Sequence, residues 1–115
     1  MGIGHTMAHI GIDLVYIPEF QKRLERSGGV GKVFTESELA RNQKIESLAG
    51  VFAAKEAFMK ALGRKIDWHD VWIEKEESGR PVLASSLLVS GERADVSISH
   101  DQWYAIAFVM LEKSD

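Results

Sequence analysis

Five charged or polar side chains stand in segments that are otherwise apolar, and their types suit the binding of a cation and of phosphate groups. They are Asp13, Lys55, Glu56, Lys60 and His100. A charged group is costly to bury alone, so each needs a metal ion, a ligand or an opposite charge beside it. Two carboxylates suit Mg²⁺, which takes one or two protein carboxylates and completes its shell with water and phosphate oxygens. Because lysines neutralise phosphates as point charges, we expect a magnesium–phosphate site.

Glu56 and Lys60 also have a simpler interpretation. Residues four apart are neighbours on a helix surface, where a pair of opposite charges contributes about 0.2–0.5 kcal/mol. Such pairs are common on solvated helix faces, so the helix by itself favours a surface ion pair over a binding site. The functional hypothesis therefore depends on what the rest of the chain places beside these two residues.

The stretch from Phe52 to Gly63 must position these side chains, and it is predicted to be a helix. Its four alanines, together with leucine and methionine, are strong helix formers, and Gly63 supplies a stop. Apolar residues recur at three- and four-residue steps from Leu48 to Leu62, so one face of the helix should be buried. We expect the helix to begin near Glu46.

Asp13 lies in a predicted strand from His9 to Val15. Alternate residues of a strand point to opposite faces, which puts Asp13 on the face of Gly11 and Val15. Aspartate is depleted in strands, and Gly11 leaves space beside it. We therefore interpret Asp13 as a candidate ligand for a cation.

A helix that begins at Pro18 carries a basic face. Proline suits the first turn of a helix, and Ser27-Gly28-Gly29 supplies its end. Lys22, Arg23 and Arg26 are suited to meet an acidic partner. A solvated face is the commoner role for such charges, and this helix alone favours it.

The remaining elements are a short helix and two hairpins. Thr35 with Glu38 fits a capping box, which starts a helix that runs to about Gln43. The hairpins join strands 71–74 and 82–83 and strands 96–100 and 103–111, and a short helix or turn is expected over residues 85–91. The last strand is almost wholly apolar, as a buried strand is.

Composition narrows the classes of function. The 115 residues suit one domain, which we place at residues 9–115 after a short leader over residues 1–8, disordered or tag-derived. A net charge of −3 argues against a general binder of nucleic acid or of anionic membranes. The absence of cysteine excludes disulfides, zinc thiolate sites and cysteine nucleophiles. No apolar run approaches the roughly 18 residues of a membrane span, so we expect a cytoplasmic protein.

Common motifs for phosphate binding and nucleophilic catalysis are missing from the sequence. There is no Gly-x-x-x-x-Gly-Lys-Ser/Thr loop and no Gly-x-Gly-x-x-Gly fingerprint. Ser99 and His100 are neighbours on a strand and face opposite sides, so they are not a nucleophile and its base. The sequence contains no nucleophile elbow that would support a serine hydrolase.

Three segments together resemble the holo-acyl-carrier-protein synthases, the small phosphopantetheinyl transferases. They are Gly11-Ile12-Asp13-Leu14-Val15, the stretch Phe52–Gly63 with its Phe-Ala-Ala-Lys-Glu-Ala core, and Ser97-Ile98-Ser99-His100 before a final apolar strand. Lesser matches at residues 34–39 and 79–81 fall in the same order. The resemblance covers nearly the whole chain, and its middle motif is highly specific.

The resemblance implies an α+β fold, in which a small antiparallel sheet packs on one long and several short helices. It implies a homotrimer with active sites in the clefts between subunits. The implied reaction transfers phosphopantetheine from coenzyme A to a serine of an acidic acyl carrier protein and releases adenosine 3′,5′-bisphosphate. Mg²⁺ is the implied cofactor.

The resemblance also implies roles for single residues. Asp13 and Glu56 would hold Mg²⁺, Lys60 would contact the coenzyme A phosphates, and these three would be the catalytic residues. The coenzyme A pocket would further include Lys55, Arg80, Pro81, Ser97, Ser99 and His100. Glu56 or a metal-bound water would take the serine proton. Carrier docking would use Lys22, Arg23 and Arg26, because opposite charges steer association.

Two positions depart from the family pattern. Glu19 stands where the family usually has an arginine that serves carrier docking, and Val51 stands where it often has an arginine that contacts coenzyme A. The departures leave two alternatives open. One is a non-catalytic trimeric relative that binds coenzyme A or a nucleotide. The other is a magnesium-dependent hydrolase of the coenzyme A pyrophosphate, with water in place of the serine.

Overall fold

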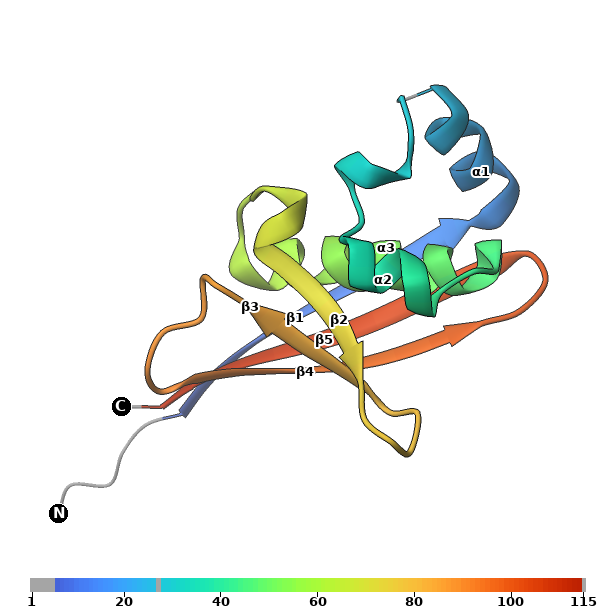
Figure 1. Ribbon diagram of the computed structural model, residues 1–115. Coiled ribbons are helices and arrows are strands. Elements are labelled where there is room, and N and C mark those ends of the chain that lie inside the picture. The colour runs from blue at the N-terminus through green and yellow to red at the C-terminus, as the bar shows by residue number, and fades with distance from the viewer. Residues whose placement is uncertain (1–5, 27, 115) are drawn as a thin grey trace, which may run out of the picture.

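A three-stranded antiparallel sheet forms the base of the molecule. The structure, a computed structural model, describes residues 6–26 and 28–114. The strands are β1 (Thr6–Tyr16), β4 (Glu92–His100) and β5 (Tyr104–Ser114), in the order β1-β5-β4. β1 pairs with β5 over its whole length, and Figure 1 shows the two strands side by side. The first and last strands of the chain are therefore neighbours, with β5 in the centre.

The long helix α3 (Ile45–Leu62) lies across one face of this sheet (Figure 1). Ala53, Ala54 and Ala57 are completely buried, because small side chains let the helix lie close to its neighbours. The closest approach is at Gly11 in β1. A Cβ atom there would overlap the carbonyl oxygen of Ala57 and would lie 2.9 Å from the amide nitrogen of Ala61. The distance between α3 and β1 therefore depends on a glycine at this position.

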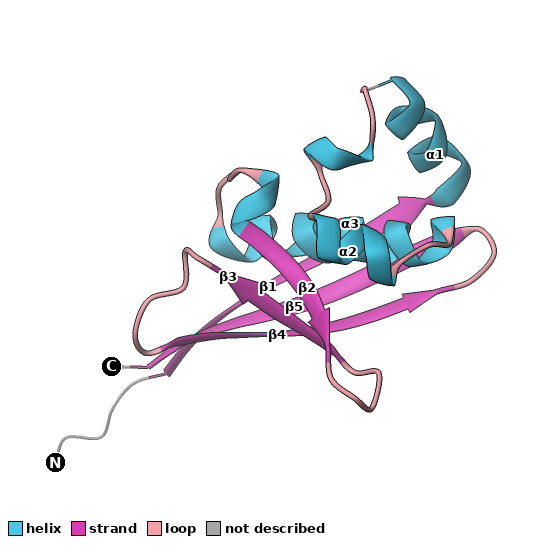
Figure 2. Ribbon diagram, in the orientation of Figure 1, coloured by secondary structure: helices cyan, strands magenta, loops and turns pink. Residues whose placement is uncertain are grey.

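Shorter elements pack around α3, as Figure 2 shows. They are α1 (Ile17–Arg26), η1 (Val30–Lys32), α2 (Glu36–Arg41), η2 (Trp68–Asp70), β2 (Val71–Lys75) and β3 (Pro81–Ser85). β2 and β3 form a separate two-stranded antiparallel hairpin. The amide N–H of Ile17 donates to the carbonyl oxygen of Trp103 at 2.8 Å, which ties the start of α1 to the turn between β4 and β5.

A buried ion pair joins α3 to α2. Lys55 and Glu38 are both 0% exposed, and the Lys55 Nζ lies 2.7 Å from Oε1 of Glu38. The same ammonium donates to the carbonyl oxygens of Val33, at 2.7 Å, and Trp68, at 3.0 Å. Oε2 of Glu38 accepts the amide N–H of Ile73 at 2.8 Å. Since an ammonium has three N–H groups, the hydrogen-bonding capacity of Lys55 is used up inside the fold.

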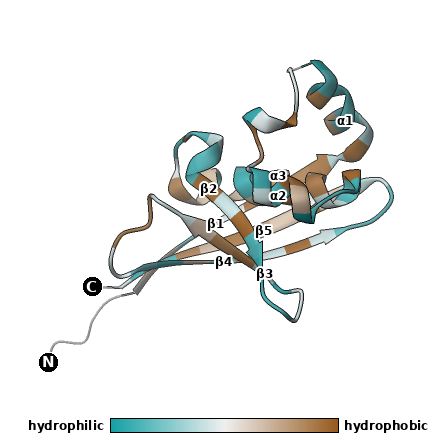
Figure 3. Cartoon of the chain, in the orientation of Figure 1, coloured by the Kyte–Doolittle hydropathy of each residue, from teal (hydrophilic) through white to brown (hydrophobic). Residues whose placement is uncertain are grey.

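The face of the sheet that points away from α3 is apolar and exposed. Its side chains on β1 and β5 are Ile10, Ile12, Leu14, Tyr16, Tyr104, Ile106 and Phe108. Their exposed fractions lie between 39% and 63%, and Figure 3 shows apolar residues along both strands. Contiguous apolar patches of this kind commonly mark interaction surfaces.

The predicted α+β architecture is confirmed, with small changes at the ends of elements. The long helix begins at Ile45, the capping box of Thr35 and Glu38 is formed, and both hairpins are present. β1 begins at Thr6, so residues 6–8 of the expected leader pair with β5, and residues 1–5 lie outside the described residues. Within residues 85–91 the chain makes turns and no helix.

None of the described helices is both long enough and apolar enough to cross a bilayer.

Candidate active site

A large cavity lies where β1 runs into α1. It has a volume of about 770 Å³, and its walls come from the end of β1, from α1 and from α3. We call it the main cavity. Its charged lining residues are Asp13, Glu19, Lys22, Arg23, Arg26, Glu56 and Lys65. The main cavity thus brings together both expected magnesium ligands and all three residues expected to dock a carrier protein.

Asp13 and Lys60 meet beside the main cavity. The Lys60 Nζ lies 3.1 Å from Oδ1 of Asp13 and donates to the carbonyl oxygen of Ile12 at 2.9 Å. The side chain of Asp13 is 15% exposed and that of Lys60 is 54% exposed. The contact is possible because Gly11 lets α3 lie against β1. The ammonium therefore balances a carboxylate that is largely withdrawn from water.

Glu56 lies on α3 one turn before Lys60 and is half-buried in the wall of the main cavity. Among residues 6–26 and 28–114 its carboxylate has no hydrogen-bond or ion-pair partner. An unpartnered carboxylate that faces a cavity keeps its full capacity to accept a proton or to bind a cation. It is therefore unlike Asp13, whose charge is already balanced.

The donor set of the main cavity suits magnesium better than zinc. In the part of the chain that the structure describes, no three His, Cys, Asp or Glu side chains gather in a way that could hold a metal ion. Zinc sites need three or four such ligands. Mg²⁺ takes only one or two protein carboxylates and draws its other ligands from water and phosphate. Asp13 and Glu56 fit that pattern.

Lys55 lies outside the main cavity, which contradicts the phosphate contact expected of it. Successive helix residues point about 100° apart, so Lys55 faces α2 while Glu56 faces the cavity. Burial lowers the pKa of the Lys55 ammonium, and the hydrogen bond and charge of Glu38 oppose this shift. With every N–H group bound inside the fold, Lys55 has none left for a ligand. Its role is structural.

His100 lines a second cavity of about 190 Å³, between the start of α3, β4 and the β2–β3 hairpin. We call it the hairpin cavity. Pro81 lines it as well, so these two predicted neighbours are found together. Val51, which is 3% exposed, forms part of the wall where an arginine was expected from the family pattern.

Arg41 also lines the hairpin cavity, and it is not among the site residues predicted from the sequence. Its Nη1 donates to the carbonyl oxygen of Ile73 at 3.1 Å, which holds the guanidinium beside the cavity that also contains His100. The sequence shows only a basic residue in the last turn of a short helix. Its proximity to His100 arises from packing between distant segments, which no local signal reveals.

Within one chain, Ser97 and Ser99 do not share the hairpin cavity with His100. Residues of a strand alternate between faces. Ile98 and His100 point towards α3, where both lie close to Gly50. Ser97 and Ser99 therefore point to the opposite, exposed face of the sheet.

Arg80 is also separated from His100. Its side chain is 67% exposed and lies 3.9 Å from the Glu76 carboxylate in the hairpin turn. It lines a third cavity, of about 250 Å³, between β3 and β4, and only its neighbour Pro81 reaches both cavities. Within one chain, the residues expected to form the coenzyme A pocket therefore lie on several separate surfaces.

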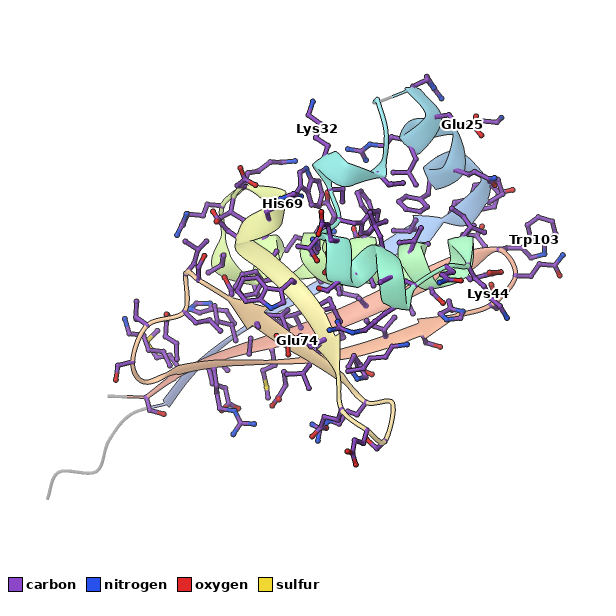
Figure 4. The ribbon with its side chains drawn as sticks, viewed as in Figure 1. Glu25, Lys32, Lys44, His69, Glu74 and Trp103 are labelled. Carbon is purple, nitrogen blue, oxygen red and sulfur yellow. The ribbon has the colours of Figure 1, made fainter. Side chains whose placement is uncertain are left out.

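The turn that follows His100 is fixed by Asp101. Its Oδ1 accepts the amide N–H groups of Tyr104, at 2.7 Å, and Trp103, at 2.8 Å. These hydrogen bonds, that of Tyr104 foremost, lower the pKa of Asp101 from its ordinary value. Figure 4 shows Trp103 at the tip of this turn. The end of β4 that carries His100 is therefore held in a defined place.

Comparisons with known proteins agree with this architecture. Residues 9–109 match the model of the 4′-phosphopantetheinyl transferase superfamily. The chain is 43% identical to a holo-acyl-carrier-protein synthase of Halalkalibacterium halodurans, with 90% of this chain and 93% of the relative covered. It is 39% identical to that of Anoxybacillus flavithermus, with 90% and 94% covered.

A solved structure gives the same result. The holo-acyl-carrier-protein synthase of Helicobacter pylori in complex with coenzyme A superimposes with a TM-score of 0.80 at 32% identity. The match covers 89% of this chain and 98% of that one. The chain therefore belongs to the holo-acyl-carrier-protein synthases of the 4′-phosphopantetheinyl transferase superfamily.

Proposed function

We propose that the main cavity is where this chain carries out the reaction of its family. In that reaction the chain transfers phosphopantetheine from coenzyme A to a serine of an apo acyl carrier protein. The observation that carries the assignment is one cavity that holds Asp13 and Glu56 beside the basic face of α1. It brings a cation and phosphate site together with a surface for an acidic protein.

The transfer exchanges one phosphorus–oxygen bond for another. The serine Oγ bonds to the phosphorus atom that bears pantetheine, and the bond from that phosphorus to the oxygen of the adenosine bisphosphate breaks. The serine proton passes to Glu56 or to a water molecule beside it. The unpartnered carboxylate of Glu56 supports this role, because nothing in the described chain competes for it.

We assign Mg²⁺ to Asp13 and Glu56. When bound, the ion would neutralise negative charge that develops on the leaving bisphosphate. Lys60 has a half-exposed ammonium on a flexible side chain, so it can exchange Asp13 for a phosphate oxygen of coenzyme A. The arrangement of two carboxylates and one mobile lysine supports this division of roles.

We also propose that the chain works as a homotrimer with active sites between subunits. The exposed apolar face of β1 and β5 supports an assembly, because it presents seven large apolar side chains to solvent. Assembly also offers a reason for the separation of Ser97 and Ser99 from His100. Side chains on the exposed sheet face can complete a neighbouring subunit's pocket, which they cannot do for their own. A cytoplasmic location stays a prediction.

Carrier docking is proposed for the basic face of α1. Lys22, Arg23 and Arg26 line the main cavity and would attract an acidic carrier protein. Glu19 lines the same cavity and brings a negative charge among them. The affinity for a carrier should therefore depend on the balance between Glu19 and its basic neighbours.

One experiment tests the reaction and its alternatives. The protein is incubated with coenzyme A, magnesium and an apo acyl carrier protein, and the carrier is weighed by mass spectrometry. A mass gain of one phosphopantetheine is the expected result. Consumption of coenzyme A with an unmodified carrier would indicate the hydrolase, and binding without consumption would indicate a non-catalytic relative. Sedimentation of the same sample tests the trimer.

A further inference from the structure

A small cavity under α1 has no part in the roles assigned so far. It has a volume of about 190 Å³ and lies between α1, η1, α3 and η2. We call it the aromatic cavity. Its lining residues are Phe20, Leu24, Val33, Phe52 and Trp68, together with the cations Arg23 and Lys32. Figure 4 shows the Lys32 side chain projecting outward from η1, so the interior is mainly apolar.

The aromatic cavity adjoins the main cavity. Phe20, Arg23 and Phe52 line both of them. The Arg23 guanidinium carbon lies 5.3 Å from the centre of the Phe52 ring, and that ring stacks on Trp68 at 5.2 Å. Phe52 stands one helical turn before Glu56. These shared side chains therefore place the apolar recess directly beside the cavity that contains Glu56.

The volume of the recess limits its occupant. An apolar cavity of about 150 Å³ lined by aliphatic and aromatic side chains can bind benzene. A cavity of 190 Å³ therefore accepts a group slightly larger than benzene. Its lining of aromatic and aliphatic carbon suits a neutral, polarisable group such as sulfur.

We propose that the aromatic cavity binds the thiol end of the pantetheine arm, either free or carrying a short acyl group. The inference rests on the proposed function, because the arm points into this recess only when its phosphates lie at the Asp13–Glu56 site. An arm that leaves Glu56 along α3 meets Phe52 first and the recess next. The thiol end of coenzyme A and a short-chain thioester match the volume, whereas a long acyl chain exceeds it.

This binding would make the chain selective for the acyl group of its donor. An acyl group stays on sulfur throughout transfer, because the bond that breaks is the phosphorus–oxygen bond at the far end of the arm. Coenzyme A and its acetyl thioester should therefore both serve as donors, and longer thioesters should serve poorly. Leu24 on α1 sets one wall of the recess and offers a position at which its volume can be changed in both directions.

Binding measurements test the recess without catalysis. Calorimetry compares coenzyme A with adenosine 3′,5′-bisphosphate, which lacks the arm, on the wild type and on Leu24→Phe. The larger ring should weaken coenzyme A binding by at least about fivefold and leave the bisphosphate unchanged. Leu39→Phe is the matched control, because Leu39 is half-buried on α2 and lines none of the cavities described above. An unchanged affinity of Leu24→Phe for coenzyme A would overturn the inference.

Transfer rates test selectivity. With free, acetyl, butyryl and octanoyl coenzyme A as donors, kcat/KM for the octanoyl donor should be at least about tenfold below that for the acetyl donor. Leu24→Ala should narrow that ratio by roughly threefold or more, and Leu39→Ala should leave it unchanged. A flat profile in the wild type, with normal transfer from coenzyme A, overturns the inference alone. Failure of coenzyme A itself as a donor overturns the proposed function and this inference with it.

Discussion

Lys55 and Lys60 stand on the same helix, and each is paired with a carboxylate from another element, yet their surroundings are opposite. Lys55 and Glu38 are completely buried, and three acceptors surround the ammonium. The Lys60 side chain is 54% exposed, with Asp13 and one carbonyl oxygen as its partners. The first pair connects elements of the fold, whereas the second borders a cavity.

The difference shows what separates a charge that is still available to a ligand from a structural one in this molecule. A charge in an apolar segment needs a partner, but that need is met equally well by the fold or by a ligand. Lys55 has no hydrogen-bonding capacity left, so a ligand could bind it only by breaking the core. Glu56 keeps its full capacity in the wall of the main cavity, and Lys60 beside it has two of its three N–H groups bound by Ile12 and Asp13. Unused capacity at a cavity therefore identifies the site better than the presence of a charge.

The largest change in stability is expected from breaking the buried pair. Lys55→Met leaves the Glu38 carboxylate buried without its counter-charge. The free energy of unfolding should therefore fall by about 3–5 kcal/mol relative to the wild type. Urea unfolding at fixed protein concentration measures this loss, because assembly would otherwise alter apparent stability. Adding Glu38→Gln to the variant removes the stranded charge and should recover part of the loss. A loss below about 1 kcal/mol would mean that the pair is not structural.

The largest change in activity is expected from removing the carboxylates at the main cavity. Glu56→Gln and Asp13→Asn each remove a carboxylate proposed to hold the metal, so transfer should fall by at least about 1000-fold. Glu56→Gln should stay folded, since the Glu56 carboxylate has no partner in the described chain to lose. Asp13→Asn should stay folded as well, because the amide oxygen can still accept from the half-exposed Lys60 ammonium. The mass assay measures transfer, and circular dichroism reports folding. Near-normal activity in either variant would remove that residue from the metal site.

Separating α3 from β1 should disturb the exposed pair more than the buried one. Gly11→Ala places a Cβ against the backbone of Ala57 and Ala61, which cannot move without shifting the helix. We expect a stability loss of about 1–3 kcal/mol together with lower activity, because Asp13 and Lys60 face each other across this contact.

The matched control for this change is Gly31→Ala. Nothing lies within 4 Å of a Cβ there, and the backbone is not in the left-handed region. Its stability and activity should equal those of the wild type. Equal behaviour of the two alanine variants would show that the close approach at Gly11 is not required.

The two lysines also show how much of the structure can be predicted from the sequence. Elements with strong local signals were predicted correctly, such as the capping box of Thr35 and Glu38 and the helix that ends before Gly63. The orientation of Lys55 was predicted wrongly. Its partner Glu38 lies on a different helix, and local spacing does not reveal which of two adjacent charges will face it.

The same limit applies to the expected coenzyme A pocket. The alternation of a strand places Ser97 and Ser99 on the face opposite His100, and the sequence already indicates this for Ser99 and His100. The grouping of Arg41 with His100 could not be inferred, because it depends on how α2 packs against the hairpin. Local patterns thus predicted the elements, whereas tertiary packing decided which charges meet.

The smallest change in stability is expected for Lys60→Met, which is the direct counterpart of Lys55→Met. The half-exposed pair with Asp13 is partly screened by water, so its loss should alter the free energy of unfolding by no more than about 1 kcal/mol. The KM for coenzyme A should instead rise roughly tenfold, because a charged hydrogen-bond donor to phosphate is lost. Urea unfolding and donor titration measure the two quantities. If Lys60→Met destabilises the protein as strongly as Lys55→Met while KM stays unchanged, the contrast between a structural and a functional lysine on α3 fails.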